Sequence, residues 1–252
     1  MEYNLTNVVV ERPTKTVYKD GNKIVKLFKE NYSKAQILNE ALNHARVEEN
    51  TDLNIPKLIE VSTIGNQTAI VIENIEGQTL ESLIEQNPEK IDEYLNIFVN
   101  LQLQVLSKSV PMLSLIKEKF KRKLNQANID DATRYELTHR LEGMKDHTKL
   151  CHGDFNPSNI VLDKNGNYHI IDWAHATQGN ASADCARTYL LFMIEGKEEL
   201  AQKYLELFSK TSEIEISTIQ RWIPIVAGAE LANNKAGERE FLEKWISVMD
   251  YE

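Results

Sequence analysis

Two short stretches of the sequence carry residue types that could transfer a phosphoryl group. The first, His-Gly-Asp-Phe-Asn-Pro-Ser-Asn, begins at residue 152 and contains Asp154 and, five positions on, Asn159. The second, Ile-Ile-Asp-Trp, places Asp172 after a short apolar run. A loop carboxylate such as Asp154 can accept the proton of an attacking hydroxyl, and the oxygens of Asn159 and Asp172 can hold Mg²⁺ on the phosphates of ATP. Phosphoryl transfer needs little covalent help from a protein, so a positioned base and a positioned metal supply most of its chemistry.

A hairpin is expected to bring the two metal-ligand candidates together. Residues 159–163 are typical of a strand, Asn-Gly-Asn at 165–167 of a turn, and residues 168–171 of a second strand. Asn159 begins the first strand and Asp172 follows the second, so strand pairing predicts that they lie side by side. A surface loop with a solvated carboxylate is the alternative, but it leaves the joint occurrence of both stretches to coincidence.

These stretches resemble the aminoglycoside phosphotransferase and choline kinase family of small-molecule kinases, which have a protein-kinase-like fold. His-Gly-Asp stands where protein kinases usually carry His-Arg-Asp, and Asp-Trp-Ala stands in place of Asp-Phe-Gly. The resemblance implies that Asp154 is the catalytic base and that Asn159 and Asp172 are metal ligands. It further implies that Asp184 braces the catalytic loop, although a carboxylate stabilised at a helix N-terminus explains Asp184 as well.

The remaining sequence predicts an α+β fold with a change of character near residue 75. Turn pairs and β-branched runs indicate strands at residues 8–10, 16–18, 24–28, 58–63 and 68–73. A helix is expected at 33–49 with Ser33 as its N-cap, and further helices are expected at 79–86, 89–108, 112–127, 130–146 and from 182 onward, interrupted at Gly196 and Pro224.

This order of elements is that of a two-lobe, protein-kinase-like fold. A five-stranded antiparallel N-terminal lobe with one helix, residues 1–75, is expected to bind the nucleotide. A mainly helical C-terminal lobe, residues 76–252, is expected to carry the catalytic loop and the substrate pocket.

Lys26 is the candidate for pairing with the α- and β-phosphates, because it lies within an apolar strand. Lys23 and Lys29 are rivals for that role. Glu40 stands among apolar residues of the following helix and is expected to face the cleft and pair with the lysine.

Other parts of a nucleotide site leave weaker signals. The linker at 73–77 is expected to bind the adenine edge through its backbone, with Glu73 and Ile75 as the candidates. The loop at 11–15 contains no glycine, so backbone N–H groups have no easy approach to phosphates there. The residues that cover the phosphates are therefore unassigned, with Thr14, Lys15 and Thr16 open as contacts.

Composition excludes several classes of partner. The chain has 252 residues and a net charge of −9, which argues against a nucleic-acid partner. The first residues lack the pattern of a signal peptide and no apolar run approaches the length of a membrane span, so a cytoplasmic protein without a membrane partner is expected. Cys151 and Cys185 have no metal or disulfide spacing, and a buried apolar role is expected for Cys151.

The expected activity is ATP- and Mg²⁺-dependent transfer of the γ-phosphate to a hydroxyl of a small molecule, with amine-bearing acceptors among the candidates. A catalytically silent nucleotide-binding module, a kinase of a protein substrate and an interaction protein stay open as alternatives. Some C-terminal acids could line a pocket for an amine, although an exposed charged helix is the plainer interpretation. They are Glu230, Glu238, Glu240 and Glu243. The acceptor and the oligomeric state leave no motif in the sequence.

Overall fold

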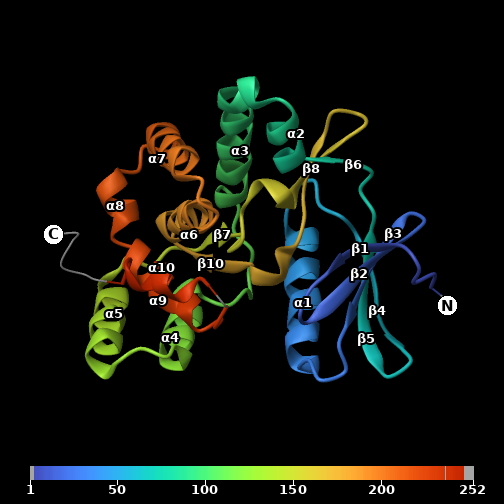
Figure 1. The fold of residues 1–252 in the computed structure, drawn as a ribbon, viewed down its shortest axis with the longest axis horizontal. Helices are drawn as coiled ribbons and strands as arrows, with labels where there is room; N and C mark the ends of the chain where they lie inside the picture. Colours follow the sequence, from blue (N-terminus) through green and yellow to red (C-terminus); the bar gives the residue numbers. More distant parts are fainter. Residues whose placement is uncertain (1–2, 236, 247–252) are drawn as a thin grey trace. The chain divides into compact units, whose positions relative to one another are not determined.

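The computed structural model describes residues 3–235 and 237–246, and the chain forms two compact units (Figure 1). The sheet unit comprises Met1–Pro88 and Pro157–His175. The helical unit comprises Glu89–Asn156 and Ala176–Glu252. Each unit is thus built from two separate segments of the chain, and the expected lobe boundary at residue 75 stays a prediction.

A five-stranded antiparallel sheet forms the centre of the sheet unit, with strand order β1-β2-β3-β5-β4. The strands are β1 (Val8–Glu11), β2 (Lys15–Asp20), β3 (Lys23–Phe28), β4 (Leu58–Ile64) and β5 (Gln67–Glu73). Gly21 and Gly65 make the turns between neighbouring strands at φ of 58° and 59°, a left-handed conformation that glycine adopts without steric cost. All five expected strands are present.

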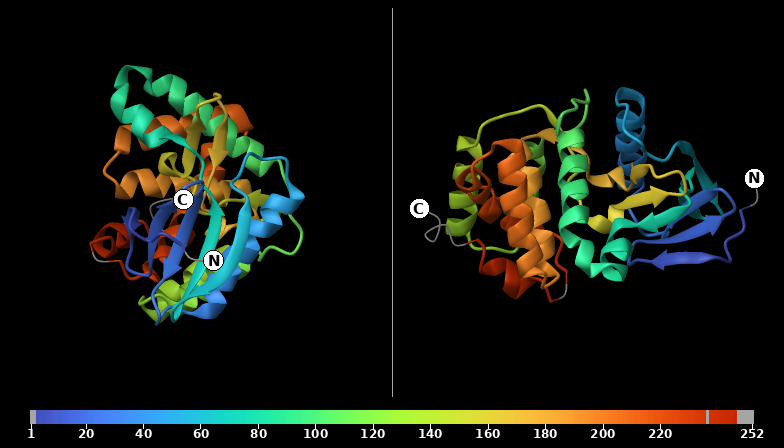
Figure 2. Two further views of the ribbon diagram at one scale, coloured as in Figure 1. Left: turned by 90° about the vertical axis from the view of Figure 1, so that its right-hand side faces the viewer. Right: turned by 90° about the horizontal axis from the view of Figure 1, so that it is seen from above.

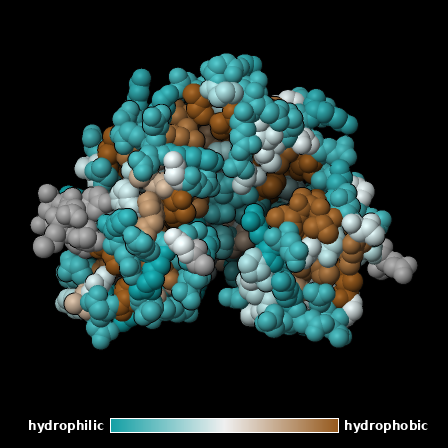
Figure 3. Space-filling view, viewed as in Figure 1, coloured by the Kyte–Doolittle hydropathy of each residue, from teal (hydrophilic) through white to brown (hydrophobic). Residues whose placement is uncertain are grey.

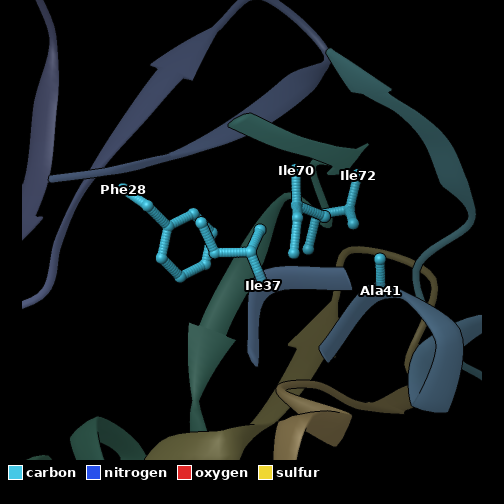
Figure 4. Close-up of a cluster of buried hydrophobic side chains, with 5 residues drawn as sticks. All are labelled: Phe28, Ile37, Ala41, Ile70 and Ile72. Carbon is cyan, nitrogen blue, oxygen red and sulfur yellow. The ribbon is translucent and has the colours of Figure 1, made fainter. Parts of the chain in front are cut away.

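Helix α1 (Lys34–Asn50) packs on one face of this sheet (Figures 1 and 2). It begins after Ser33, whose hydroxyl accepts a hydrogen bond from the N–H of Gln36 at 3.5 Å. The apolar side chains between helix and sheet, shown in Figure 4, are Phe28, Ile37, Ala41, Ile70 and Ile72. The opposite face buries Val25, Leu27, Ala69 and Val71. Because side chains alternate across a strand, Lys26 projects from the α1 face.

A second, three-stranded sheet in the same unit carries the expected hairpin. Its strands, in the order β6-β8-β9, are β6 (Gly77–Thr79), β8 (Ile160–Asp163) and β9 (Tyr168–Ile170). Ile160 pairs with Ile170, and the carboxylate of Asp163 accepts the N–H groups of Asn165 and Asn167 at 2.8 and 2.9 Å. These bonds close the turn. Helix α2 (Leu80–Gln86) follows β6 and is capped by Thr79.

Eight helices and a two-stranded sheet make up the described part of the helical unit. The helices are α3 (Ile91–Leu106), α4 (Ile116–Gln126), α5 (Asp131–Gly143), α6 (Ala181–Ile194), α7 (Glu198–Ser212), α8 (Ile216–Gln220), α9 (Ile223–Leu231) and α10 (Arg239–Glu243), and the strands are β7 (Lys149–Cys151) and β10 (Thr177–Gly179). Rings of Phe98, Phe155, Phe192 and Tyr204 contact one another in the core.

Two expected helix interruptions have different outcomes. Gly196 follows α6 with φ of 70°, as expected of a glycine beyond a helix end. Pro224 was expected to interrupt a helix but lies in the first turn of α9, where the N–H that proline lacks has no partner within the helix. Cys151 and Cys185 are both buried free thiols, as expected for Cys151.

Hydrophilic residues cover much of the face shown in Figure 3, with apolar patches between them. The exposed large apolar residues include Val8, Val9, Met112 and Leu115. Scattered apolar side chains of this kind are normal on a protein surface. No helix within residues 3–235 and 237–246 combines the length and the apolar character needed to cross a membrane.

We expect Gly77→Ala to destabilise the protein by about 1–3 kcal/mol, the usual cost of overpacking. A Cβ atom at residue 77 would stand 2.0 Å from the carbonyl oxygen of Leu162 on the neighbouring strand β8. Urea unfolding measures the change. Gly143→Ala is the matched control, because nothing lies within 4 Å of the added Cβ. Equal stabilities of the two variants would contradict the close approach of β6 to β8.

Candidate active site

Asp172 lies two residues after the end of strand β9 (Tyr168–Ile170) in the sheet unit. Its φ is 62°, a left-handed conformation that is uncommon outside glycine but is tolerated by aspartate better than by most residues. The N–H of Ile171 donates to the carbonyl of Asn159 at 2.9 Å. Asn159 ends the short 3-10 helix Pro157–Asn159. The hairpin therefore brings the two backbone segments that carry Asn159 and Asp172 next to each other.

Lys26 is a buried cation held between two acids. Its Nζ lies 2.8 Å from Glu40 Oε1 and 2.8 Å from Asp172 Oδ1, and the residue is 8% exposed. Burial alone would lower the pKa of Lys26, but Asp172 and Glu40 raise it above its usual value. The rivals lie elsewhere, since Lys23 stands over the ring of Tyr3 and Lys29 is exposed. The structure thus brings Lys26, Glu40 and Asp172 together.

Glu40 on α1 also forms an ion pair with Lys15, one of the three residues that the sequence left open as phosphate contacts. Lys15 Nζ lies 3.0 and 3.2 Å from the two carboxylate oxygens of Glu40. Burial alone would raise the pKa of Glu40, but Lys26 and then Lys15 bring it below its usual value. Lys26 likewise lowers the pKa of Asp172 against the effect of burial. Both carboxyl groups are therefore ionised at neutral pH.

Helix α1 is tied to the segment that follows Asp172. The side-chain amide of Asn43 donates to the carbonyl of Ala174 at 3.2 Å, in the 3-10 helix Trp173–His175. His44 Nε2 lies 2.7 Å from the carbonyl oxygen of Pro56. The Asn43 contact ties the helix that carries Glu40 to the backbone two residues after Asp172, and the His44 contact ties the same helix to the segment before β4.

Of the two linker candidates for adenine binding, Glu73 is the last residue of β5 and Ile75 lies two residues beyond it. The N–H of Glu73 donates to the carbonyl of Lys57, and the N–H of Asn74 donates to the carbonyl of Asn22, both at 2.9 Å. These two N–H groups are used inside the protein. The carbonyl of Glu73 and the backbone of Ile75 are therefore the groups that we still expect to bind the adenine edge.

Asp154 lies in the helical unit, in the loop after β7. Gly153 has φ of 79°, and its N–H donates to Asp184 Oδ1 at 2.7 Å. The other oxygen of Asp184 accepts Gln102 Nε2 at 3.1 Å, and Asp184 is only 1% exposed. Asp184 therefore ties the loop that carries Asp154 to the first turn of α6, and the role that the family resemblance implies for Asp184 stays a prediction.

A chain of alternating charges connects Asp154 to three helices. Arg187 Nη2 on α6 lies 3.6 Å from Asp154 Oδ1 and 3.1 Å from Glu230 Oε2 on α9. Lys123 Nζ on α4 lies 2.9 Å from Glu230 Oε1. On the same helix, burial and the cation of Lys123 lower the pKa of Lys119 to about 7, against the opposing effect of Glu230.

For Glu230, the interpretation as part of an exposed charged helix is wrong. Glu230 is 5% exposed, whereas Glu240 and Glu243 are exposed. All nine residues of α9 are buried, and the nearly continuous apolar run around Glu230 was the available signal. The contacts of Arg187 with Asp154 and Glu230 were not predicted, because the sequence of a helix does not show which distant side chains an arginine will contact.

Comparisons with known proteins bear on the family and the fold of the chain. A model of the phosphotransferase enzyme family matches residues 14–215. A thermostable mutant of aminoglycoside phosphotransferase APH(4)-Ia, in complex with AMP-PNP and hygromycin B, is 14% identical, with a TM-score of 0.70 over 96% of this chain and 91% of that chain. ADP-bound aminoglycoside phosphotransferase APH(2'')-Ib is 16% identical, with a TM-score of 0.63 over 98% and 92%. No curated protein matches the sequence. The likeness to solved structures confirms the expected α+β, protein-kinase-like fold.

We expect the stabilising contribution of Glu230 to depend on pH. Burial alone would raise its pKa, but Arg187 and then Lys123 lower it from about 4.5 to about 2. The unfolded chain binds the proton at the higher pH, so the contribution is complete above about pH 4.5 and is lost as the pH falls towards 2. At pH 7, Glu230→Gln should cost about 3 kcal/mol, because two buried cations lose their partner.

Urea unfolding at pH 7, 5 and 4 tests this expectation. The difference in unfolding free energy between the parent and Glu230→Gln should shrink below pH 5, because Glu230 of the unfolded parent begins to bind a proton there while the folded parent keeps its carboxylate charged. The exposed control Glu240→Gln should match the parent at each pH. A difference for Glu230→Gln that grows on acidification would contradict the assigned ion pairs.

Proposed function

Because the chain belongs to the phosphotransferase enzyme family, we propose that it transfers the γ-phosphate of ATP to a hydroxyl group of a small molecule, with Asp154 as the base. The observation that carries the proposal is the pair of 2.8 Å contacts that hold Lys26 between Glu40 and Asp172. A fixed lysine next to a metal-binding carboxylate is what nucleotide phosphates require in a kinase-like site. Residues 1–75 would form the nucleotide lobe and residues 76–252 the lobe with the acceptor site.

The residues assigned to the metal suit Mg²⁺. Asn159 and Asp172 offer hard oxygen ligands, and the lowered pKa of Asp172 keeps its carboxylate charged. Within the described residues no group of three or more His, Cys, Asp or Glu side chains is placed to hold a metal ion. Mg²⁺ characteristically takes one or two carboxylates and completes its shell with waters and substrate phosphates, so two protein ligands are sufficient. When bound, the ion would neutralise charge on the phosphates.

For the nucleotide, we assign the adenine edge to the backbone of Glu73 and Ile75. The phosphates would lie against Lys26, whose amine stays charged because Glu40 and Asp172 raise its pKa. Complexes of the structurally similar proteins with ADP and AMP-PNP support a nucleotide of this class.

The proposed chemical step uses Asp154 as proton acceptor. The acceptor hydroxyl would pass its proton to the carboxylate while its oxygen bonds to the γ-phosphorus, and the bond from that phosphorus to the bridging oxygen would break with its electron pair leaving on ADP. The Gly153–Asp184 hydrogen bond and the proximity of Arg187 support this role, because they hold the loop in one arrangement. Positioning of this kind supplies much of the rate enhancement in phosphoryl transfer.

A small acceptor is favoured over a protein. Asp172 is followed by the 3-10 helix Trp173–His175, by β10 and by the start of α6 at Ala181. This short segment leaves little room for the activation segment and peptide platform of a protein kinase. The cytoplasmic location stays a prediction.

Identification of the acceptor comes first. An ADP-release screen with ATP and Mg²⁺ against amines, amino alcohols and sugars should find an acceptor that accelerates release. A silent nucleotide-binding module would bind ATP but release no ADP with any of them, and an interaction protein on the same scaffold would bind no ATP.

With that acceptor, Asp154→Ala should lower turnover by a factor on the order of 10² or more, the usual contribution of a general base. Nucleotide affinity should stay unchanged, because the substitution removes no proposed nucleotide contact. Asp131→Asn is the control, since its side chain is fully exposed and pairs only locally with Arg134. Turnover of Asp154→Ala within a few-fold of the parent at saturating ATP would discard the assignment.

We expect Asp172→Ala to remove the Mg²⁺-dependent part of nucleotide affinity. Calorimetric titration of AMP-PNP, with Mg²⁺ and with EDTA, measures that part as the ratio of the two dissociation constants. The parent should bind more tightly with Mg²⁺, and the variant should show little difference. A variant that keeps the parent's ratio would exclude Asp172 as a ligand.

A further inference from the structure

We propose that Lys15 is a phosphate-binding residue of the nucleotide site, supplying by its side chain the positive charge that backbone N–H groups supply in a glycine-rich loop. The inference rests on the proposed function and assigns a contact which that function leaves open. Three features of the sheet unit carry it: the loop before Lys15, the face from which Lys15 projects, and the charges around Glu40.

The loop between β1 and β2 is poorly suited to bind phosphate through its backbone. Pro13 has no N–H, and the N–H of Arg12 donates to the carbonyl of Lys15 at 2.8 Å. The carbonyl of Thr14 accepts the N–H of Lys29 at 2.9 Å, which ties the loop to the end of β3. The loop also contains no glycine, the residue that most readily lets a backbone approach a ligand closely. A side chain is therefore the better source of phosphate contacts here.

Lys15 projects towards the same place as Lys26. It is the first residue of β2, and Val17, two residues on, pairs with Lys26 on β3. Directly paired residues share a face of the sheet, as do residues two apart on a strand. The two amines meet at one atom, since Glu40 Oε1 lies 3.0 Å from Lys15 Nζ and 2.8 Å from Lys26 Nζ.

The aromatic ring of Phe28 gives the Lys15 amine a second contact. Lys15 pairs with Phe28 across the strands, and its Nζ lies 5.3 Å from the centroid of that ring. The side chain is 15% exposed, compared with 39% for Lys19 on the same strand. A long, flexible side chain is thus held partly buried beside the lysine already assigned to the phosphates.

Charge balance indicates an anionic ligand for this pair of lysines. Lys15 and Lys26 face two acids, Glu40 and Asp172. With Asp172 assigned to the metal ion, Glu40 alone balances only one of the two lysines. A phosphate oxygen supplies the missing negative charge, and lysine is a common partner of phosphate.

The decisive experiment compares ligands that differ in their phosphates. Calorimetry with Mg²⁺ and AMP-PNP, and separately with adenosine, should show that Lys15→Gln weakens AMP-PNP about tenfold or more, the scale of one charge-assisted hydrogen bond, and leaves adenosine within about twofold. Lys19→Gln is the matched control, because Lys19 lies on the same strand and pairs with Glu76. It should bind both ligands like the parent. Equal weakening of both ligands by Lys15→Gln, or no weakening, would overturn the proposal.

A double-mutant cycle with Glu40 separates phosphate binding from a purely structural role. If Lys15 only neutralised Glu40, then Lys15→Gln would have no effect on AMP-PNP affinity in a Glu40→Gln background, and the proposal would be overturned. If Lys15 binds phosphate, AMP-PNP affinity should fall about tenfold in that background too. The comparison of Glu40→Gln with the double variant does not use the Lys15→Gln single variant, so it can still be made if that single variant fails to fold.

The result can be distinguished from failure of the proposed function itself. A parent protein that binds neither AMP-PNP nor adenosine would refute nucleotide binding as a whole. A parent that binds Mg²⁺ and AMP-PNP, together with a Lys15→Gln variant of equal affinity, would refute only the assignment of Lys15.

Discussion

A charged amine can be buried only if fixed counter-charges surround it, and Lys26 imposes this constraint on the sheet unit. Its Nζ joins a strand, a helix and the segment after a hairpin, through Glu40 and Asp172. Breaking a buried pair by removing one partner typically costs about 3–5 kcal/mol, because the remaining charge stays without compensation. The register of β3, the position of α1 and the left-handed backbone at Asp172 are therefore interdependent. The charged groups that order this part of the structure, Lys26 and Asp172, are thus also the groups proposed to bind the phosphates and the metal ion.

The helical unit applies the same principle next to Asp154, the proposed base. Glu230 is almost fully buried, and Arg187 and Lys123 approach it from two neighbouring helices. Arg187 also reaches Asp154, so the loop with the proposed base is linked to the ion pairs of the core. Buried ion pairs of this kind add little net stability compared with apolar packing, but an arrangement of the helices that separates the partners is costly because it leaves a buried charge uncompensated. Positioning the loop is the function that best accounts for them.

The features that could be predicted from the sequence are those with local causes. Strands, turns and caps follow from alternation, from glycine at left-handed positions and from side chains such as Ser33 that bond to nearby N–H groups. The hairpin before Asp172 was predictable for this reason, and the family and the fold were predicted correctly. The choice of Lys26 over its neighbours followed from its place in an apolar strand, and the structure places it between the two acids. The functional roles of these residues stay predictions.

Features that depend on distant packing were missed. The contact of Lys15 with Glu40 arises only when α1 packs on the sheet, and burial of Glu230 arises only when several helices enclose α9. The contact of Lys15 with Glu40 leaves no pattern in the sequence, and the apolar run around Glu230 indicates burial but not which cations contact the carboxylate. The strands β6, β7 and β10 have three residues each, and none is marked by an adjacent Asn-Gly turn such as the one that indicated the equally short β9. In each case the missing information is tertiary, because the same residue types would be solvated in another fold.

The two cysteines have a practical consequence for work on this protein. Both thiols are fully buried, and burial raises the pKa of Cys151 and of Cys185. Since only the thiolate reacts with maleimides or iodoacetamide, both should resist alkylation for as long as the protein stays folded. A cysteine introduced at an exposed position would then be the sole labelling point, and fluorescent or spin probes could be attached without first deleting the native pair.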